Sequence, residues 1–335
     1  MRKMTKKLGV LLMIATILVG CGKKEKNSEV ENSPKTASEQ KSEKVYKVGI
    51  LQFIDHVSLD AAREGFIDEL TKNGIEAEII YKNSNGDMSL TTTIAQSVIN
   101  DDVDLVYAIS TPSAQGAINV IGDKPMVFSA VSDPVEAGLV KSIEDVGGNV
   151  TGVSDYVESG KQVDEFLKLY PNVKTFGVLY NTSEINSDVQ IKELEKVLND
   201  RGLNLEKVGV NNINDIAQGI TSLSNKIDAL FAITDNLVAN AAPVVSENLL
   251  EKKIPSLSSE EGQVKKGLLM SEGVNYYEHG AQAADIAIRI LKGEEPKNIA
   301  VEYNKKNSKV VNKKTAEVLG IDLNSEVFDD ANIIE

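Results

Sequence analysis

The chain has 335 residues, 41% of them hydrophobic, and a formal net charge of −14. This length allows one large or two medium domains, each with a real core. The acidic balance argues against a nucleic-acid partner, which needs a basic stripe, and a single cysteine, Cys21, excludes an intramolecular disulfide.

The N-terminus has the parts of an export signal. A basic segment is followed by an apolar run over 8–19 that is short for a membrane span. The sequence LVGC over 18–21 resembles the bacterial lipobox, whose cysteine is lipidated and becomes the mature N-terminus. We therefore expect a signal peptide over 1–20, and a lipidated Cys21 with a flexible tether over 21–44. The protein would then be lipid-anchored on the extracellular face of the cell membrane. The alternative is a plain signal peptide with a chance cysteine.

Short apolar runs alternate with amphipathic stretches after the tether. The periodicity predicts strands over 45–53, 76–81, 104–110 and 125–131, with helices over 59–74, 89–100 and from Thr111 onward. This order is typical of a doubly wound, mostly parallel sheet.

The same pattern then restarts. We expect strands over 175–180, 205–210, 228–234 and 254–258, and helices over 185–202, 213–224 and 237–251. The segment 148–160 is a predicted crossover, and a long helix over 275–293 returns to the first lobe. The fold class is therefore α/β, with two doubly wound Rossmann-like lobes joined by a hinge: lobe I over 45–153 plus 275–305, and lobe II over 154–274 plus 306–335.

Ligands of open parallel sheets bind beyond the carboxyl ends of the strands. The residues at those ends are rich in hydroxyls, amides and carboxylates, without arginine or lysine. The candidate ligand-binding residues are Gln52, Phe53, His56, Ser110, Thr111, Pro112, Ser113, Ser132, Asp133, Asp155, Tyr156, Asn181, Glu184, Asn186, Ser187, Thr234, Asp235, Asn236 and Glu260. Any one of them could instead be an ordinary cap or turn former.

The motifs of common enzyme classes are missing from the sequence. The first strand is followed by no GxGxxG motif, and the chain has no Walker loop and no GxSxG elbow. Of the two histidines, His56 lies near a strand end and could touch a ligand or serve a turn, whereas His279 lies within a predicted helix, where a surface or packing role is expected. We expect no catalytic residue, no metal and no cofactor.

Several stretches together carry a family resemblance. They are GILQFIDHVSLDAAREGF, ISTPSAQGA, VFSAVSDPVEAGLV, GNVTGVSDY, YNTSEINSDVQ, ITDN, GVNYYEHG and KVVNKKTAEVLGI. The body from about residue 45 resembles the bacterial ABC-transporter substrate-binding proteins of the tryptophan/tyrosine type, with the periplasmic-binding-protein type I fold.

The resemblance implies a tethered receptor, expected to be a monomer, that closes two lobes on a solute and delivers it to an ABC permease and its ATPase. The implied solute is tyrosine, tryptophan or phenylalanine, although members with other ligands exist. A sugar receptor is the rival binder, and a surface adhesin with a host or matrix partner is a possible second role. A repressor of the same fold would carry a DNA-binding segment where this chain has a lipobox.

A free amino acid needs donors for its carboxylate and an acceptor for its ammonium. With no arginine at the strand ends, the donors must be hydroxyls and backbone N–H groups, and the helix starting at Thr111 supplies both. Simple capping by Ser110 or Thr111 is the alternative.

For the ammonium, Asp235 is the first choice, because it follows a strand of lobe II and would meet the ligand on closure. Asp133, Asp155 and Glu184 are alternatives. Phe53 and Tyr156 are the nearest aromatic residues for the ring of the solute, although either could pack in the hinge instead.

Overall fold

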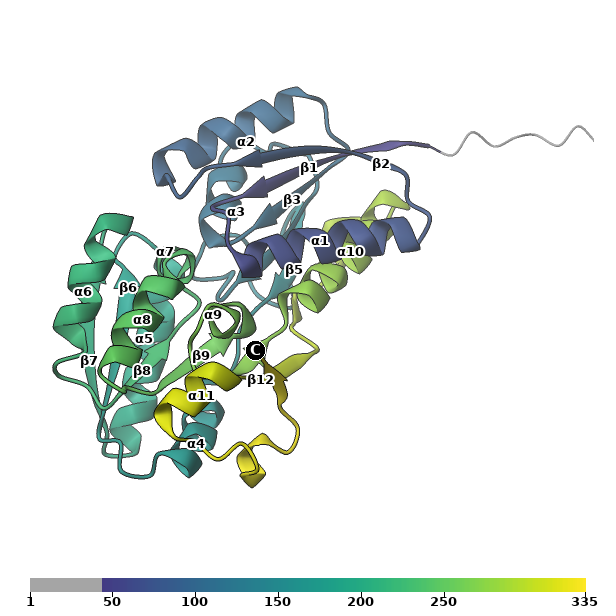
Figure 1. The fold of residues 1–335 in the computed structure, drawn as a ribbon. Coiled ribbons are helices and arrows are strands. Elements are labelled where there is room, and N and C mark those ends of the chain that lie inside the picture. The colour runs from purple at the N-terminus through teal and green to yellow at the C-terminus, as the bar shows by residue number, and fades with distance from the viewer. Residues whose placement is uncertain (1–43) are drawn as a thin grey trace, which may run out of the picture. The chain divides into compact units, whose positions relative to one another are not determined.

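The computed structural model describes residues 44–335, which form one unit with two α/β lobes (Figure 1). The expected signal peptide, Cys21 and nearly all of the expected tether lie outside the described residues. Within residues 44–335, no helix has both the length and the apolar character needed to cross a membrane.

Lobe I is built on a six-stranded sheet with the order β11-β5-β4-β3-β1-β2, in which every neighbouring pair is parallel. Its strands are β1 Tyr46–Gln52, β2 Ala77–Asn83, β3 Leu105–Ile109, β4 Met126–Val131, β5 Val150–Ser154 and β11 Glu302–Tyr303. Its helices are α1 Val57–Lys72, α2 Thr91–Asn100, α3 Thr111–Ile118 and α10 Tyr276–Leu291, with 3-10 turns at Met88–Leu90 and Pro296–Asn298.

Lobe II is built on a seven-stranded sheet with the order β13-β12-β10-β9-β8-β6-β7, in which only the β10–β12 pair is antiparallel. Its strands are β6 Thr175–Asn181, β7 Asn204–Val210, β8 Ala229–Ala232, β9 Ser256–Glu260, β10 Met270–Val274, β12 Asn307–Asn312 and β13 Asn332–Ile334. Its helices are α4 Ser159–Leu169, α5 Ile185–Asp200, α6 Ile216–Leu223, α7 Asn236–Asn240, α8 Ala242–Glu251, α9 Glu261–Lys265 and α11 Lys313–Leu319, with 3-10 turns at Ile213–Asp215 and Glu326–Phe328.

The predicted fold class is confirmed by these two parallel-dominated sheets. The chain passes between the sheets three times, after β5, between β10 and α10, and between β11 and β12. Helix α10 packs beside α1 on lobe I, although it follows the strands of lobe II in sequence (Figure 1).

Some elements differ from the sequence-based expectation. The predicted crossover 148–160 contains β5 and the first residues of α4, and the predicted helix 237–251 is two helices separated at Ala241. Strands β10 and β12 were not predicted, because β10 carries Glu272 and Gly273 among its apolar residues and β12 has only two consecutive valines. Both strands are stabilised by pairing with each other, which local periodicity does not reveal.

Each sheet is covered by apolar side chains on both faces, as expected for parallel sheets. On lobe I, α1 and α10 approach so closely that two glycines are required at their contact. A Cβ on Gly65 would lie 2.0 Å from the carbonyl oxygen of Tyr277, and one on Gly280 would lie 1.9 Å from that of Ala62.

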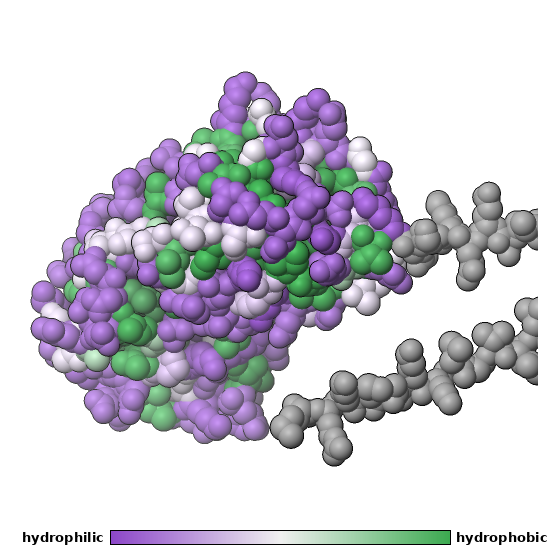
Figure 2. Space-filling view, turned by 90° about the horizontal axis from the view of Figure 1, so that it is seen from above, coloured by the Kyte–Doolittle hydropathy of each residue, from purple (hydrophilic) through white to green (hydrophobic). Residues whose placement is uncertain are grey.

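The outer surface is mostly hydrophilic on the face that Figure 2 shows. Hydrophilic residues cover most of the face seen in Figure 2, and hydrophobic residues occupy smaller parts of it.

Candidate ligand-binding site

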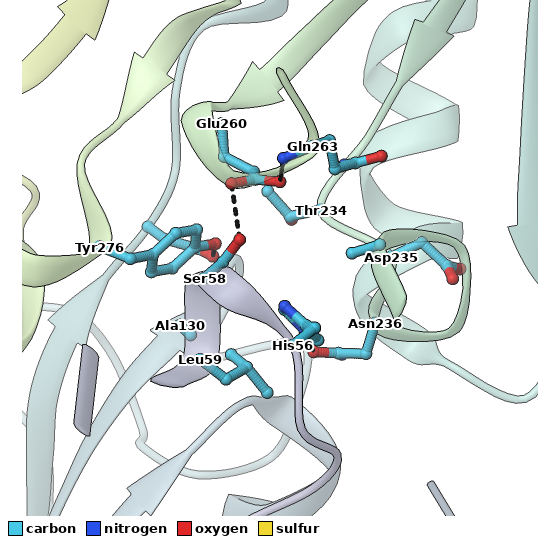
Figure 3. A pocket seen from close by; sticks show the side chains of 12 residues that line it. His56, Ser58, Leu59, Ala130, Thr234, Asp235, Asn236, Glu260, Gln263 and Tyr276 are labelled. Atoms are coloured by element: carbon cyan, nitrogen blue, oxygen red, sulfur yellow. Dashed lines mark hydrogen bonds between the residues drawn. The ribbon is translucent and has the colours of Figure 1, made fainter. Parts of the chain in front are cut away.

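A cavity between the lobes gathers the carboxyl ends of strands from both sheets (Figure 3). The space between its walls is about 270 Å³, including the part that opens to solvent. It is lined by His56, Ser58, Leu59, Ala130 and Asp155, by Thr234, Asp235, Asn236, Ala239, Glu260 and Gln263 of lobe II, and by Tyr276 at the start of α10.

Asp155 follows β5 and has one carboxylate oxygen free among the described residues. The hydroxyl of Tyr276 donates to Oδ2 at 2.5 Å, whereas Oδ1 is buried and has no partner. Burial raises the pKa of this carboxyl. A buried carboxylate oxygen at a cavity wall is a strong acceptor for a cationic group, because little water competes with the ligand.

Asp235, the first choice for the ammonium from sequence, has a different arrangement. The backbone N–H of Asn181 and the hydroxyl of Ser187 both donate to Oδ2 at 2.6 Å, and the N–H of Val238 donates to Oδ1 at 2.9 Å. The residue caps α7 and joins it to the end of β6. In Figure 3 its carboxylate points away from the cavity. Burial and the nearby carboxylate of Glu184 raise its pKa.

The other two alternative carboxylates are also held by protein donors. Glu184 accepts from the side-chain amides of Asn181, Asn186 and Asn236. Asp133 is half-buried, and its Oδ1 accepts from the backbone N–H groups of Val135 and Glu136. Of the four candidates, Asp155 alone both lines the cavity and keeps a buried oxygen without a partner.

The hydrogen bonds around His56 fix the tautomer of its ring. The side-chain amide of Asn236 donates to Glu184 at 2.5 Å, so its oxygen Oδ1 is an acceptor. Nε2 of His56 therefore donates to that oxygen at 3.4 Å. Nδ1 is left as a bare acceptor, buried and without a partner among the described residues. Burial lowers the pKa of this histidine to about 4, so the ring is neutral at pH 7.

The N-terminus of α3 lies buried beside the cavity strands but does not line the cavity itself. Ser110 has φ 92° and ψ 156°, a conformation that costs a non-glycine residue about 1–3 kcal/mol. Its hydroxyl accepts from the N–H of Ser113 at 3.5 Å. The hydroxyls of Thr111 and Ser113 are buried and have no partner within residues 44–335, and Pro112 occupies the first turn.

The remaining candidates lie around the cavity rather than in it. Gln52 is buried and makes side-chain hydrogen bonds with Asp60 and Arg63. Phe53 is buried and does not line the cavity. Tyr156 is 44% exposed and packs edge to face with Tyr303, so it is not a ring contact of this cavity. Arg63 also brings a guanidinium to the end of β1, although no arginine lies in the strand-end loops.

Sequence reasoning missed half of the cavity lining, including Ser58, Gln263 and Tyr276. Ser58 and Gln263 lie in the first turn of helices rather than in loops, and Tyr276 begins the helix that was predicted to return to lobe I. The common signal is that each follows a strand end by a few residues, at the start of the next helix.

Further contacts join the lobes around the cavity. The hydroxyls of Ser132 and Thr234 lie 3.2 Å apart, and the side-chain amide of Gln190 donates to Ser132 at 3.2 Å. At the other side, the side-chain amide of Asn240 donates to the carbonyl of Asp55 at 2.8 Å.

His279 is fully buried and connects the cavity wall to a crossover of the chain, so its role is in packing and hydrogen bonding and the surface alternative is wrong. The N–H of Ala130 donates to Nε2 at 3.0 Å, and Nδ1 lies 3.2 Å from Oδ1 of Asn304. Since Nε2 accepts, Nδ1 carries the proton. Ala130 needs this support because its φ is 54°, a strained value for alanine.

We expect His279 to remain neutral down to acidic pH. Burial lowers its pKa from 6.5 to about 4. Between these values the unfolded chain binds more protons than the folded one, so the contribution of His279 to the free energy of unfolding falls as the pH is lowered through this interval. Nuclear magnetic resonance of the ring should show the Nδ1–H tautomer and no titration between pH 5.5 and 8. A midpoint near 6.5 would contradict this.

Relatives with named ligands resemble this chain over most of its length. A tyrosine-binding protein from Clostridioides difficile is 39% identical over 309 residues, 91% of this chain and 88% of its own. The structure of a Streptococcus pneumonia ABC domain in complex with L-Trp is 35% identical, covers 87% of this chain and 100% of its own, and has a TM-score of 0.83.

A second solved structure is more similar to this chain in sequence but less similar in the superposition of its backbone. The ligand-free, open structure of a substrate-binding protein with adhesive properties from Clostridium difficile is 40% identical and covers 87% of this chain and 99% of its own, but its TM-score is 0.68. The chain described here therefore superposes better on the L-Trp complex than on the open structure, although its sequence is nearer to the latter.

The family model described as ABC transporter substrate binding protein matches residues 47–334, almost the whole body. With two Rossmann-like lobes, a polar cavity between their strand ends and these relatives, the chain belongs to the family of ABC transporter substrate-binding proteins.

Proposed function

We propose that this protein captures a free aromatic amino acid between its lobes and presents it to an ABC importer. The observation that carries this proposal is the unpartnered, buried Oδ1 of Asp155 in the cavity between the lobes. Such an oxygen suits an ammonium group, and the relatives named for tyrosine and L-Trp support an aromatic amino acid in particular.

The order of the strands in lobe I supports a zwitterionic solute, because it sets the distance between the proposed ammonium and carboxylate sites. Asp155 follows β5 and Thr111 follows β3, with β4 between them. Two strand spacings are about 10 Å. In a free amino acid the ammonium and the carboxylate are on the same carbon. If each makes a hydrogen bond of about 2.8 Å to the protein, the two protein groups lie a similar distance apart. Thr111 and Ser113 lie beside the cavity and not in its lining, but their buried hydroxyls have no partner within residues 44–335. These hydroxyls and the N–H groups of α3 are the proposed donors to the carboxylate, which requires the bound solute to extend the cavity toward α3.

The rest of the cavity offers a surface for the ring. Leu59, Ala130, Ala239 and the ring of Tyr276 provide apolar wall, and Nδ1 of His56 adds one acceptor. An aromatic side chain with an O–H or N–H group fits this mixture, because it has both an apolar body and a donor.

Calorimetry with a set of related solutes tests the proposal. Tyrosine or tryptophan should bind, whereas tyramine lacks the carboxylate and N-acetyltyrosine lacks the ammonium. Each loss removes charge-assisted hydrogen bonds worth roughly 1.5–3 kcal/mol apiece, so binding should weaken by roughly tenfold or more. Binding of glucose or arabinose instead would favour the sugar-receptor alternative, and equal binding of tyramine and tyrosine would exclude the carboxylate site.

We also propose membrane anchoring through a lipid on Cys21, supported by the sequence LVGC at 18–21. Cys21→Ser should abolish labelling by a radioactive or clickable fatty acid and shift the protein from the membrane fraction to the medium, or leave it unprocessed. Lys23→Ser, two residues away, should leave labelling intact. Unchanged labelling of Cys21→Ser would overturn the anchor.

A second, surface role in adhesion is supported by the description of the 40% identical relative as having adhesive properties. A deletion strain compared with its parent for attachment to host cells and matrix, and separately for uptake of labelled tyrosine, would separate the two roles.

A further inference from the structure

One buried hydrogen bond joins the two lobes beside the cavity. The hydroxyl of Ser58, in the first turn of α1, donates to Oε2 of Glu260 at the end of β9, at 2.7 Å (Figure 3). The two residues are 202 positions apart in sequence, and their exposed fractions are only 4% and 2%.

Both oxygens of Glu260 are already occupied by protein donors. Oε1 accepts from the backbone N–H of Gln263 at 2.8 Å, and Oε2 accepts from that of Gly262 as well as from Ser58. The carboxylate therefore caps α9 in lobe II and binds α1 in lobe I at the same time. Both oxygens of Glu260 thus have protein donors, although the sequence predicted Glu260 as a ligand contact.

Gly262 allows this approach of the lobes. A Cβ at this position would lie 2.2 Å from Oγ of Ser58, 2.9 Å from Oε2 of Glu260 and 3.3 Å from the backbone nitrogen of Ser58. Gly262 is not among the glycines with positive φ, so its own backbone does not require a glycine. The shortest of these contacts comes from Ser58 of the other lobe, and it disappears when the lobes separate, whereas the contact with the side chain of Glu260 lies within lobe II.

We propose that Ser58, Glu260 and Gly262 form a latch between the lobes, which stabilises the closed form and sets the lifetime of the bound solute. Glu260 is a positioning residue here, since it acts through the lobe contact and does not touch the solute. This inference rests on the proposed function because it assumes that the two lobes close when a solute binds between them.

A latch affects the rate of solute release more than the rate of capture. The open form binds first, and the contact between Ser58 and Glu260 forms as the lobes close. Losing a buried hydrogen bond to a carboxylate should therefore raise the dissociation rate by roughly tenfold or more and leave the association rate within about threefold.

The kinetic test uses Ser58→Ala and Gly262→Ala, with Gly148→Ala as the matched control. A Cβ on Gly148 would meet nothing within 4 Å, and its φ is not positive. Stopped-flow binding of tyrosine should show faster dissociation in both latch variants and no change in the control. The ratio of affinities for tyrosine and tyramine should stay as in the unmodified protein. An unchanged dissociation rate, or a changed ratio, would overturn the latch.

A test without solute separates this inference from the proposed function. Ser58→Cys and Gly262→Cys are combined in a Cys21→Ser background, which leaves only the two new thiols. Oxidation should form a disulfide and reduce the radius of gyration in small-angle scattering, reversibly with reductant. If no disulfide forms, the latch is wrong even where tyrosine binds. If it forms but the unmodified protein binds no aromatic amino acid, the solute assignment fails and the lobe contact stands.

Discussion

Replacing Asp155 with asparagine should lower the affinity for tyrosine by roughly tenfold to a hundredfold and leave the fold intact. The substitution keeps the size of the side chain but removes the charge that faces the cavity. A charge-assisted hydrogen bond contributes roughly 1.5–3 kcal/mol, and each 1.4 kcal/mol is about tenfold in the dissociation constant. Isothermal titration calorimetry measures the loss, and thermal unfolding checks the fold.

Asp235→Asn is the matched control, because it makes the same chemical change in the same cavity wall. Here the carboxylate accepts three hydrogen bonds from Asn181, Ser187 and Val238. Its loss should destabilise the protein by about 1–3 kcal/mol, with little effect on the affinity of the folded fraction. The opposite pattern, an affinity loss in Asp235→Asn alone, would restore Asp235 as the ammonium partner.

Gly280→Ala should be among the most destabilising single substitutions on lobe I. The new methyl would lie 1.9 Å from the carbonyl oxygen of Ala62, 2.6 Å from its carbonyl carbon and 2.8 Å from its Cα. These are backbone atoms, so no side-chain rotation relieves the clash, and α1 and α10 must move apart. Overpacking of this kind costs about 3 kcal/mol or more, which exceeds the gain of about 1 kcal/mol from alanine in a helix.

Urea denaturation followed by circular dichroism measures this difference. Gly148→Ala serves as the control, because a Cβ there would meet no atom within 4 Å, and it should change the free energy of unfolding by less than about 0.5 kcal/mol. Equal unfolding midpoints for the two variants would show that α1 and α10 are not in such close contact.

Much of the fold follows from local pattern, because strands β1, β3, β4, β6 and β8 are short apolar runs. Of these, β3 and β8 are each followed by a helix with a side-chain cap, from Ser110 and Asp235. The confirmed fold class depends on these runs. Strands β10 and β12 depend on each other for pairing, and no local period marks them. The return of α10 to lobe I was predictable as a long helix, but the close contact through Gly65 and Gly280 was not.

Half of the residues that line the cavity were among the sequence candidates, but the roles of those residues could not be told from the sequence. Asp155 and Asp235 both follow strands of parallel sheets, so their sequence settings are alike. What distinguishes them is whether N–H groups from Asn181 and Val238 reach the carboxylate, and this is decided by tertiary packing. Similarly, Tyr156 follows directly after Asp155, but its ring lies against Tyr303 on the outside while the carboxylate of Asp155 lines the cavity.

The three passages of the chain between the sheets have a consequence for how the protein can be divided. A single cut in the passage after β5 would leave β1–β5 on one fragment, and α10 and β11 on the other with all of lobe II. The fragments would remain joined by the packing of α1 on α10 and by the parallel pairing of β5 with β11. A protease-nicked molecule would thus migrate as one particle until denaturant is added, and separately expressed halves could complement each other.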